Sequence, residues 1–320
     1  MADNKVRRGV VLAPTDLDTV NWLDYFDDNL NLLGIHSGGG ESHNVIDRLG
    51  VYGTEEFRKI CRERNIDFEY ELHAPQQLMD YSLFAEHPEY FYENSRLNER
   101  MDNGNWCVSS PALELVAKNA VMLADKLPCS TNRFFYWGVD KGGEDWCHCD
   151  KCSKLNAADQ CLATANAMVQ ELRKSNPDAV VGSIFYLATM QLPSSVEPVD
   201  GVIAEYAPFR RCYKHTLDDP DCAVNREYYR RFKEIISMFG ADRTHVLEYH
   251  IDSSYASVRT GCHRRCPCRD LDTMKRDIAV YARHGITSFT SFAVDINKEY
   301  LDLYGDTDIK NYLEAIKEIQ

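Results

Sequence analysis

The sequence predicts an α/β fold, namely a single (β/α)8 TIM barrel with extended, cysteine-rich loops, and two observations lead to it. Eight short apolar, β-branched runs alternate with amphipathic stretches, a rhythm that indicates a parallel sheet covered by helices. Eight repeats favour a closed barrel over an open sheet, and 320 residues is a usual length for one such barrel. No Pro-, Ser- or Gly-rich linker interrupts the chain, so we expect one domain over residues 1–320.

The expected strands are the apolar runs, most of which end in a polar or charged residue. In order they are Gly9–Ala13, Leu32–His36, Asp67–His73, Phe134–Asp140, Val180–Ala188, Gly201–Tyr206, His245–Asp252 and Ile286–Asp295. The expected helices are the amphipathic stretches Asp18–Asn31, Ser110–Leu127, Ala157–Lys174, Arg226–Phe239 and Leu271–His284. Because such barrels carry their chemistry at the carboxyl ends of the strands, the residues there are the first candidates for a site.

Charge and hydropathy exclude several partners. The chain has 50 acidic and 36 basic residues and a formal net charge of −14, which would repel the phosphates of a nucleic acid and an anionic membrane surface. No apolar run is long enough to cross a bilayer, and the N-terminal residues lack the apolar core of a signal peptide. We therefore expect a cytoplasmic protein with neither a nucleic-acid nor a membrane partner.

Twelve cysteines include two tight clusters. The first is Cys147-His-Cys149-Asp-Lys-Cys152, where three closely spaced thiolates can converge on one ion. A structural zinc takes four ligands. Cys107 lies in the connection after the third strand, next to the connection that carries this cluster, and is the expected fourth ligand. A site of this kind would be structural, because several thiolates neutralise the ion. Free thiols in ordered loops are the alternative.

The second cluster is Cys262, Cys266 and Cys268, and Cys212 or Cys222 could complete it. Its spacing predicts zinc less strongly than that of the first. No organic cofactor is expected, because Gly38-Gly-Gly-Glu lacks both phosphate-loop glycine patterns.

Carboxylates at three strand ends suit glycoside hydrolysis, in which one carboxyl group protonates the leaving oxygen and another supports the reacting carbon. The candidates are Asp140, Glu205 and Glu248. Strand alternation predicts that Glu248, His250 and Asp252 share one face and line the mouth of the barrel. An ion pair with a neighbouring Arg or Lys is the alternative for any one of them.

The remaining strand-end residues are candidates for binding substrate. Histidine can bond sugar hydroxyls or move protons, and aromatic rings can stack on sugars. Trp137 is a candidate stacking platform, although core packing is the commoner role of a strand tryptophan. A basic group after the sixth strand, Arg210, Arg211, Lys214 and His215, could bind an anionic sugar or lie in a solvated loop. The full set of substrate-binding candidates is His36, His73, Trp137, Tyr186, Tyr206, Arg210, His215, His250 and Asp252.

The segment from Trp137-Gly-Val-Asp140 to Trp146-Cys-His-Cys-Asp-Lys-Cys152 resembles an element of the DUF4838 proteins. These are large bacterial barrel proteins, some of them classed as glycoside hydrolase family 163. The similarity covers roughly Cys107 to Asp252. It includes Cys107-Val-Ser-Ser-Pro111, Asn176-Pro-Asp178, Ile184-Phe-Tyr-Leu-Ala188, Arg211-Cys-Tyr-Lys-His215 and Cys222.

The resemblance implies a retaining endo-β-N-acetylglucosaminidase in which the acetamido oxygen of the substrate attacks the anomeric carbon. Asp140 matches the family's aspartate and would orient the acetamide. Glu205 is the first choice for the general acid and Glu248 the second. Lys141 follows Asp140, whereas family 20 hexosaminidases have an Asp-Glu pair there. A cytoplasmic enzyme that trims imported oligosaccharides fits this chain better than one acting on extracellular N-glycans.

Two other functions are compatible with the same residues. One is a carbohydrate-binding barrel without turnover, in which tyrosine and tryptophan rings stack on the sugar. The other is a metal-dependent hydrolase or isomerase that uses His36, His73, His250 and Asp252 as ligands. The sequence does not fix the sugar, the linkage or the oligomeric state.

Overall fold

Eight parallel strands close into a barrel, in the order β1-β2-β3-β6-β7-β8-β9-β10 around the ring. The computed structural model describes residues 5–26, 29–36, 49–50, 52, 54–140, 142–254 and 271–320. The strands are β1 (Arg7–Leu12), β2 (Leu32–Ile35), β3 (Asp67–His73), β6 (Arg133–Trp137), β7 (Val180–Phe185), β8 (Val202–Tyr206), β9 (Thr244–Glu248) and β10 (Ser288–Phe292). The predicted (β/α)8 class is confirmed.

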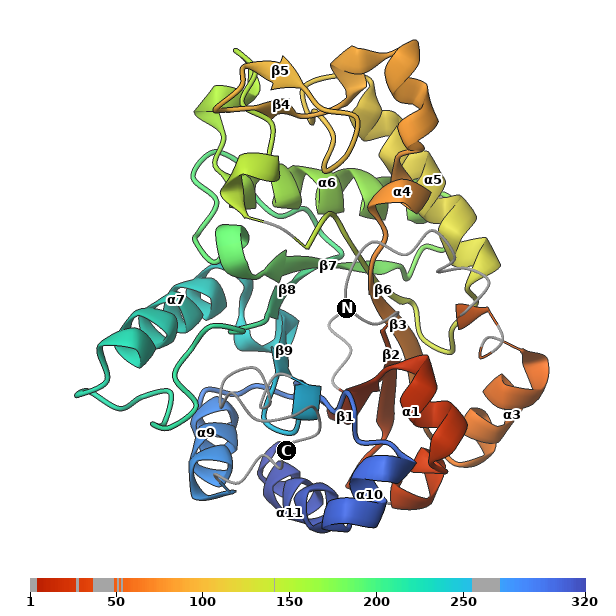
Figure 1. Ribbon diagram of the computed structural model, residues 1–320, viewed down its shortest axis with the longest axis vertical. Coiled ribbons are helices and arrows are strands. Elements are labelled where there is room, and N and C mark those ends of the chain that lie inside the picture. Colours follow the sequence, from red (N-terminus) through yellow and green to blue (C-terminus); the bar gives the residue numbers. More distant parts are fainter. Residues whose placement is uncertain are drawn as a thin grey trace. The chain divides into compact units, whose positions relative to one another are not determined.

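Helices lie between the strands along the chain (Figure 1). They are α1 (Pro14–Thr19), α3 (Glu55–Glu63), α4 (Pro75–Leu78), α5 (Ala112–Lys126), α6 (Ala157–Leu172), α7 (Ala223–Phe239), α9 (Leu271–Arg283), α10 (Lys298–Tyr304) and α11 (Thr307–Ala315). Within the described ranges, no helix has both the length and the apolar character needed to span a membrane.

Several predicted strands extend too far at their carboxyl ends. The ladders stop at Trp137, Glu248 and Phe292, three or four residues before the predicted ends. The apolar pattern continues past the last ladder position because loop residues such as Val139 and Ile251 are buried as well. Asp140, Asp252 and Asp295 therefore lie in the loops after their strands.

Two local predictions differ from the structure. The expected helix Asp18–Asn31 is replaced by α1 and a 3-10 helix at Trp22–Tyr25, because Pro14 starts the helix four residues earlier than expected. The long connection after β3 contains an unpredicted antiparallel pair, β4 (Glu93–Asn94) and β5 (Glu99–Arg100). Strands of two residues are too short to show an alternating pattern.

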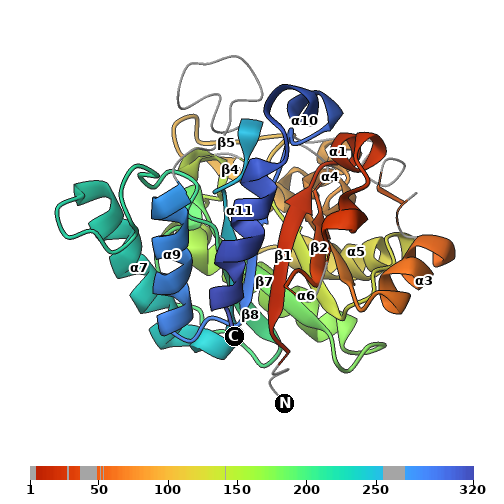
Figure 2. The same ribbon diagram turned by 90° about the horizontal axis from the view of Figure 1, so that it is seen from below.

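The chain forms two compact units. The first unit contains β1, β2, β9 and β10 with α1, α7, α9, α10 and α11, and the second contains β4 to β7 with α4, α5 and α6. Strands β3 and β8 and helix α3 contribute residues to both. In the second unit α6 packs on α5 and on β7 (Figure 1). In the first unit α9 and α11 lie side by side (Figure 2).

A fully buried arginine connects the loop after β8 to β9 and α9 in the first unit. The Arg211 Nε lies 3.0 Å from Glu248 Oε1, and its Nη2 lies 2.5 Å from Asp277 Oδ2. The hydroxyls of Tyr213 and Tyr281 also donate to Glu248. Burial raises the pKa of Asp277 to about 7, against the opposing effect of the Arg211 charge. The positive charge of Arg211 and the negative charges of its carboxylate partners offset the cost of excluding water from each of them.

Replacing Arg211 with methionine should be strongly destabilising, because two buried carboxylates lose their cation. We expect the free energy of unfolding to fall by about 3–5 kcal/mol. Urea denaturation at pH 8, above the pKa of Asp277, measures the change. Arg210→Met is the matched control, since Arg210 is the adjacent residue and is exposed; it should change stability by less than about 0.5 kcal/mol. Equal midpoints for the two variants would contradict a structural role for the Arg211 ion pairs.

Candidate functional site

His73 and Asp140 come together at the carboxyl ends of β3 and β6. His73 pairs in register with Trp137 across the two strands, and Asp140 follows three residues later. The Nδ1 atom of His73 lies 2.7 Å from the Gly138 carbonyl oxygen. That oxygen can only accept, so Nδ1 carries the proton. The Nε2 atom lies 4.0 Å from Asp140 Oδ1, and the Asp140 side chain is 34% exposed.

The turn that carries Asp140 is fixed by Asn105. The side chain of Asn105 is buried, and its Oδ1 accepts the N–H of Val139 at 3.1 Å while its Nδ2 donates to the Asp145 carbonyl at 3.0 Å. A Cβ atom on Gly138 would lie 2.1 Å from the same Oδ1. Gly138 is therefore required for the close approach of this amide. The sequence pattern gave no signal for Asn105, because it lies in an irregular loop.

Two aromatic rings surround His73. The ring of Trp137 contacts it edge-on at 4.9 Å between centroids, and the ring of half-buried Tyr186 lies at 6.2 Å. Trp137 is only 4% exposed, so its position matches core packing, the alternative to a sugar platform. Tyr186 comes from the end of β7 and retains exposed surface.

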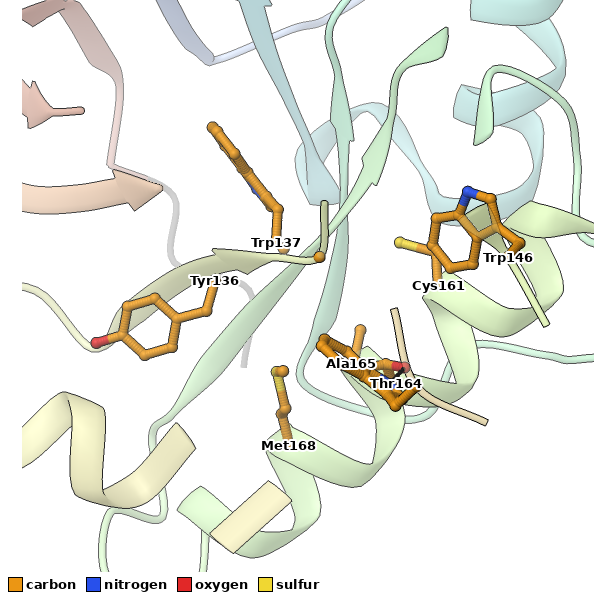
Figure 3. A pocket seen from close by; sticks show the side chains of 10 residues that line it. Tyr136, Trp137, Trp146, Cys161, Thr164, Ala165 and Met168 are labelled. Carbon is orange, nitrogen blue, oxygen red and sulfur yellow. Dashed lines mark hydrogen bonds between the residues drawn. The ribbon is translucent and has the colours of Figure 1, made fainter. Parts of the chain in front are cut away.

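A small pocket also lies in the second unit, and Figure 3 shows its lining. Thr164, Ala165 and Met168 of α6 and Tyr136 of β6 form part of its wall. The ring of Trp137 points away from the α6 side chains in this view. The pocket therefore lies between the sheet and α6. Trp137 and Gly138, which contact His73, also line it, whereas His73 and Asp140 themselves do not.

Four cysteines form a buried cluster in the second unit. The sulfur atoms of Cys107, Cys147, Cys149 and Cys152 all lie within 4.8 Å of one another. Cys107 Sγ lies 3.7 Å from both Cys149 Sγ and Cys152 Sγ. A tetrahedral ion with metal–sulfur bonds of about 2.3 Å separates its sulfurs by about 3.8 Å. The cluster predicted from sequence, including Cys107 as its fourth member, is thus arranged so that it could hold a metal ion.

The thiols of this cluster affect one another strongly. Hydrogen bonds from Cys147 and Cys152 hold the pKa of Cys107 far below its ordinary value, and Arg100 contributes. The hydrogen bond to Cys107 raises the pKa of Cys152 to about 11. One thiolate therefore forms readily and makes the next harder to form, a conflict that a divalent cation would remove.

Glu205 and Tyr206 point to opposite sides of β8. The carboxylate of Glu205 is fully buried and lies within 4.8 Å of the His245 ring. Tyr206 faces α7, where its hydroxyl donates to the Tyr228 carbonyl at 3.0 Å. The Tyr206 side chain has no exposed surface and packs against α7, so its position matches a structural role.

Glu248 does not line the mouth of the barrel, contrary to the prediction from strand alternation. Its carboxylate faces α9, where it contacts Tyr281. Burial acts to raise its pKa, but the charges of Arg211 and His250 hold the pKa below its ordinary value. His250 belongs to the same network, with Nε2 3.4 Å from Arg211 Nη2 and 3.7 Å from Asp277 Oδ2.

The other predicted residues of the first unit are spread over its surface and interior. Arg210 and His215 are exposed whereas Arg211 is buried, so the basic group is not one patch. His36 is buried with its ring edge on Phe292. Asp252 is buried and accepts a hydrogen bond from Ser254. The predicted cysteines Cys262, Cys266 and Cys268, the glycines 38–40 and Lys141 lie outside the described residues.

Asp16, in the first turn of α1, is a buried acid that the sequence analysis missed. Its Oδ2 accepts the N–H groups of Ala13 and Asp295 at 3.3 and 3.2 Å. Its Oδ1 has no hydrogen-bond partner among the described residues. Burial, with added repulsion from Asp295 and Asp252, raises the pKa of Asp16 to about 7. Asp16 is thus a carboxyl group that can carry a proton near neutral pH.

The raised pKa of Asp16 predicts a pH-dependent loss of stability. The folded state binds the proton more tightly than the unfolded state, so stability present at pH 4 is lost as pH rises through about 7. The loss amounts to at most about 4 kcal/mol at 1.36 kcal/mol per pKa unit. Asp16→Asn cannot ionise, so its stability relative to the natural chain should improve from pH 5 to pH 8. Urea denaturation at both values measures this.

Asp18→Asn is the control, since Asp18 lies exposed on the same helix and should show no such trend. A difference between Asp16→Asn and the natural chain that is the same at both pH values would mean that Asp16 ionises normally.

Known structures resemble this chain in fold. The cellulose synthase subunit Z from Clostridioides difficile matches with a TM-score of 0.52 and 10% identity, covering 98% of this chain and 99% of that one. A tri-modular family 5 endo-β-1,4-glucanase from Bacillus licheniformis matches with a TM-score of 0.53 and 12% identity, covering 98% and 60%. Endo-glycoceramidase II from Rhodococcus sp. matches with a TM-score of 0.50 and 11% identity, covering 90% and 73%. At such identities the likeness shows the fold alone.

No curated protein matches the chain in sequence. A family model does match, over residues 47–314, and its description is "Domain of unknown function (DUF4838)". That range contains the four-cysteine cluster and both His73 and Asp140. Because the match covers most of the chain, the chain belongs to the DUF4838 family, as its cysteine element predicted.

Proposed function

We propose that this chain is a glycoside hydrolase whose active site includes His73 and Asp140. The observation that carries the proposal is their pairing at the carboxyl ends of adjacent barrel strands. Barrel enzymes place reacting groups at these ends. The Asp140 carboxylate is partly exposed while its imidazole partner is buried and oriented by a backbone carbonyl. A catalytic carboxylate must contact the substrate and keep a fixed direction, and an exposed carboxylate beside a buried, oriented imidazole meets both needs.

A carbohydrate substrate agrees with the barrels that this chain resembles. One of them is described as an endo-β-1,4-glucanase complexed with cellotetraose, and another as an endo-glycoceramidase with a lactosyl-enzyme intermediate. These descriptions belong to those proteins, and fold alone does not transfer an activity. They support the class of substrate, and the paired residues of this chain support the class of reaction.

Within this class we favour cleavage of a β-N-acetylglucosaminide with participation of the substrate. Asp140 accepts the acetamide N–H and so aims the acetamide oxygen at the anomeric carbon. The oxygen forms a bond to that carbon as the glycosidic bond breaks, and a general acid gives its proton to the leaving oxygen. Water then attacks the same carbon as the bond to the acetamide oxygen breaks, and the general acid recovers a proton from the water. His73 keeps Asp140 in its orienting position, and Tyr186 lies where it can contact the sugar.

Glu205 is our choice for the general acid, since Glu248 is less suited to that role. The Arg211 and His250 charges keep Glu248 ionised, and a general acid must hold a proton at working pH. Glu205 is fully buried, and its carboxylate lies within 4.8 Å of the His245 ring. Glu248 then serves the structure of the first unit.

Asp140→Asn should abolish turnover, because the amide cannot stabilise the positive charge that develops next to it. We expect the rate of hydrolysis of aryl β-N-acetylglucosaminides and free N-glycans to fall by at least about 10²-fold, the usual size of a lost charge contribution. His73→Gln should cost less, because Asp140 keeps its carboxylate. Thermal unfolding of each variant, with exposed Asp150→Asn as control, separates loss of chemistry from loss of fold.

Glu205→Gln tests the choice of the general acid. We expect the rate of hydrolysis to fall by at least about 10²-fold, because a general acid typically contributes that much or more. Full activity in both single variants would rule out this site. Sugar binding without turnover in the natural chain, unaffected by Asp140→Asn, would favour a carbohydrate-binding barrel.

We further propose that the four-cysteine cluster holds a structural zinc ion. Its sulfur spacing suits zinc, and thiolates favour zinc over magnesium and calcium. Four thiolates would leave no open position for substrate. The ion would bind Cys107 to the segment 147–152, which follows the turn that carries Asp140.

Cys149→Ser should bind one equivalent of zinc less than the natural chain and should melt at a lower temperature. Metal analysis of protein purified in zinc-containing, reducing buffer measures the first effect, and calorimetry the second. Cys161→Ser is the control, because Cys161 lies in the same unit outside the cluster. Unchanged zinc content in Cys149→Ser would contradict a four-thiolate site.

A further inference from the structure

A second set of metal-ligand side chains lies in the first unit, apart from the proposed activity. Cys212 and His215 belong to the loop between β8 and α7, and Cys222 immediately precedes α7. Their two sulfur atoms and one ring nitrogen lie within 4.8 Å of one another. Cys212 Sγ lies 3.4 Å from His215 Nδ1. Bonds of about 2.3 Å to sulfur and about 2.0 Å to nitrogen would place these two atoms about 3.5 Å apart around a tetrahedral zinc ion.

The backbone that carries two of these ligands is fixed by one buried amide. Asn225 of α7 is fully buried, and its Oδ1 accepts the N–H of Cys212 at 2.8 Å. Its Nδ2 donates to the carbonyl oxygens of Cys212, His215 and Thr216 at 2.8 to 2.9 Å. The loop is therefore shaped before any ligand binds, which lowers the ordering cost of binding.

Arg211 holds the same loop from its other side. Its guanidinium forms the two buried ion pairs with Glu248 and Asp277, directly next to Cys212 in sequence. Asp277 Oδ1 also accepts the N–H of Leu217 at 2.6 Å. Residues 211–217 are thus fixed at both ends, while the ring of His215 is exposed to solvent. A rigid loop with one open side is suited to admit an ion.

Cys222 lies where the loop meets the helix. It is the N-cap residue of the 17-residue helix α7. Its side chain is 8% exposed, so it would lie on the interior side of a bound ion and His215 on the solvent side. The three donors come from two elements, so one ion would join the loop to the helix.

We propose that Cys212, His215 and Cys222 form a second zinc site. Two thiolates and an imidazole are the ligands that zinc prefers, and they disfavour magnesium and calcium. Three protein ligands leave one coordination position for water or a further donor. Binding releases the thiol protons to solvent and involves no change of oxidation state. The ion would fix the loop after β8 against the start of α7.

Metal content tests this proposal without an activity assay. His215→Asn and Cys222→Ser should each remove one equivalent of zinc relative to the natural chain. Each should do so again when Cys149→Ser has already removed the ion from the first cluster. Lys214→Asn is the matched control, because Lys214 is exposed in the same loop and has no thiol or imidazole. Differences between variants are compared, so zinc bound elsewhere does not affect the result.

Cobalt gives a readout that a purely structural role would not change. In the Cys149→Ser background, Co²⁺ bound at this site should give a sulfur-to-cobalt charge-transfer band from two thiolates. Cys222→Ser should weaken that band about twofold if one of the two sulfur ligands is lost. His215→Asn should keep the band per bound ion but lower the affinity for Co²⁺ by at least about tenfold.

Two outcomes would overturn the proposal. One is unchanged zinc content in both His215→Asn and Cys222→Ser. The other is a disulfide between Cys212 and Cys222 in protein kept under reducing conditions. Neither outcome bears on the glycosidase assignment, which rests on other residues, namely His73, Asp140 and Glu205.

Discussion

The buried charge of Arg211 is the constraint on which much of the first unit depends. A guanidinium without water is tolerated only where carboxylates surround it, and here Glu248 and Asp277 do so. The first comes from a strand and the second from a helix, so the pairing fixes β9, α9 and the loop after β8 together. Tyr213 and Tyr281 complete the bonds of Glu248. The same contacts remove Glu248 from the mouth of the barrel and shape the loop that carries Cys212 and His215.

In the second unit, the buried amide of Asn105 fixes a loop, as Arg211 does in the first. Asn105 bonds the backbone on both sides of the Asp140 loop, at Val139 and at Asp145. The cysteine cluster then follows within a few residues. The carboxylate proposed for catalysis thus lies between two fixed points and is itself partly exposed. Rigid surroundings and an accessible group are what orientation of a substrate requires.

The sequence predicted the fold well, because strand and helix periods are local signals that repeat eight times. It also predicted that Cys107 joins the cluster, which follows from the adjacency of successive strands in a barrel. It named His73 and Asp140 as separate candidates without pairing them. It predicted the direction of Glu248 wrongly. Both faces of a barrel strand are buried, so alternation shows that two residues differ in direction without showing which one faces inward.

Other features left no sequence signal. Asp16 looks like an ordinary acid in the first turn of a helix, and only the packing around it reveals its burial. Asn105 and Asn225 are single amides, yet each holds a loop through hydrogen bonds to backbone atoms well beyond one helical turn or strand pair, as far as 40 residues away for Asn105 and 10 for Asn225. Long-range hydrogen bonds of this kind depend on tertiary structure and have no period.

The close approach of Gly138 to Asn105 has a consequence for how this chain can vary. A methyl group at position 138 would occupy the space of the Asn105 amide oxygen. A change at either position alone therefore breaks the turn before Asp140. A smaller side chain at position 105 would make room for a larger one at position 138. Relatives that keep the turn should preserve both residues or exchange both, and a relative in which only one is changed should no longer hold the aspartate in this position.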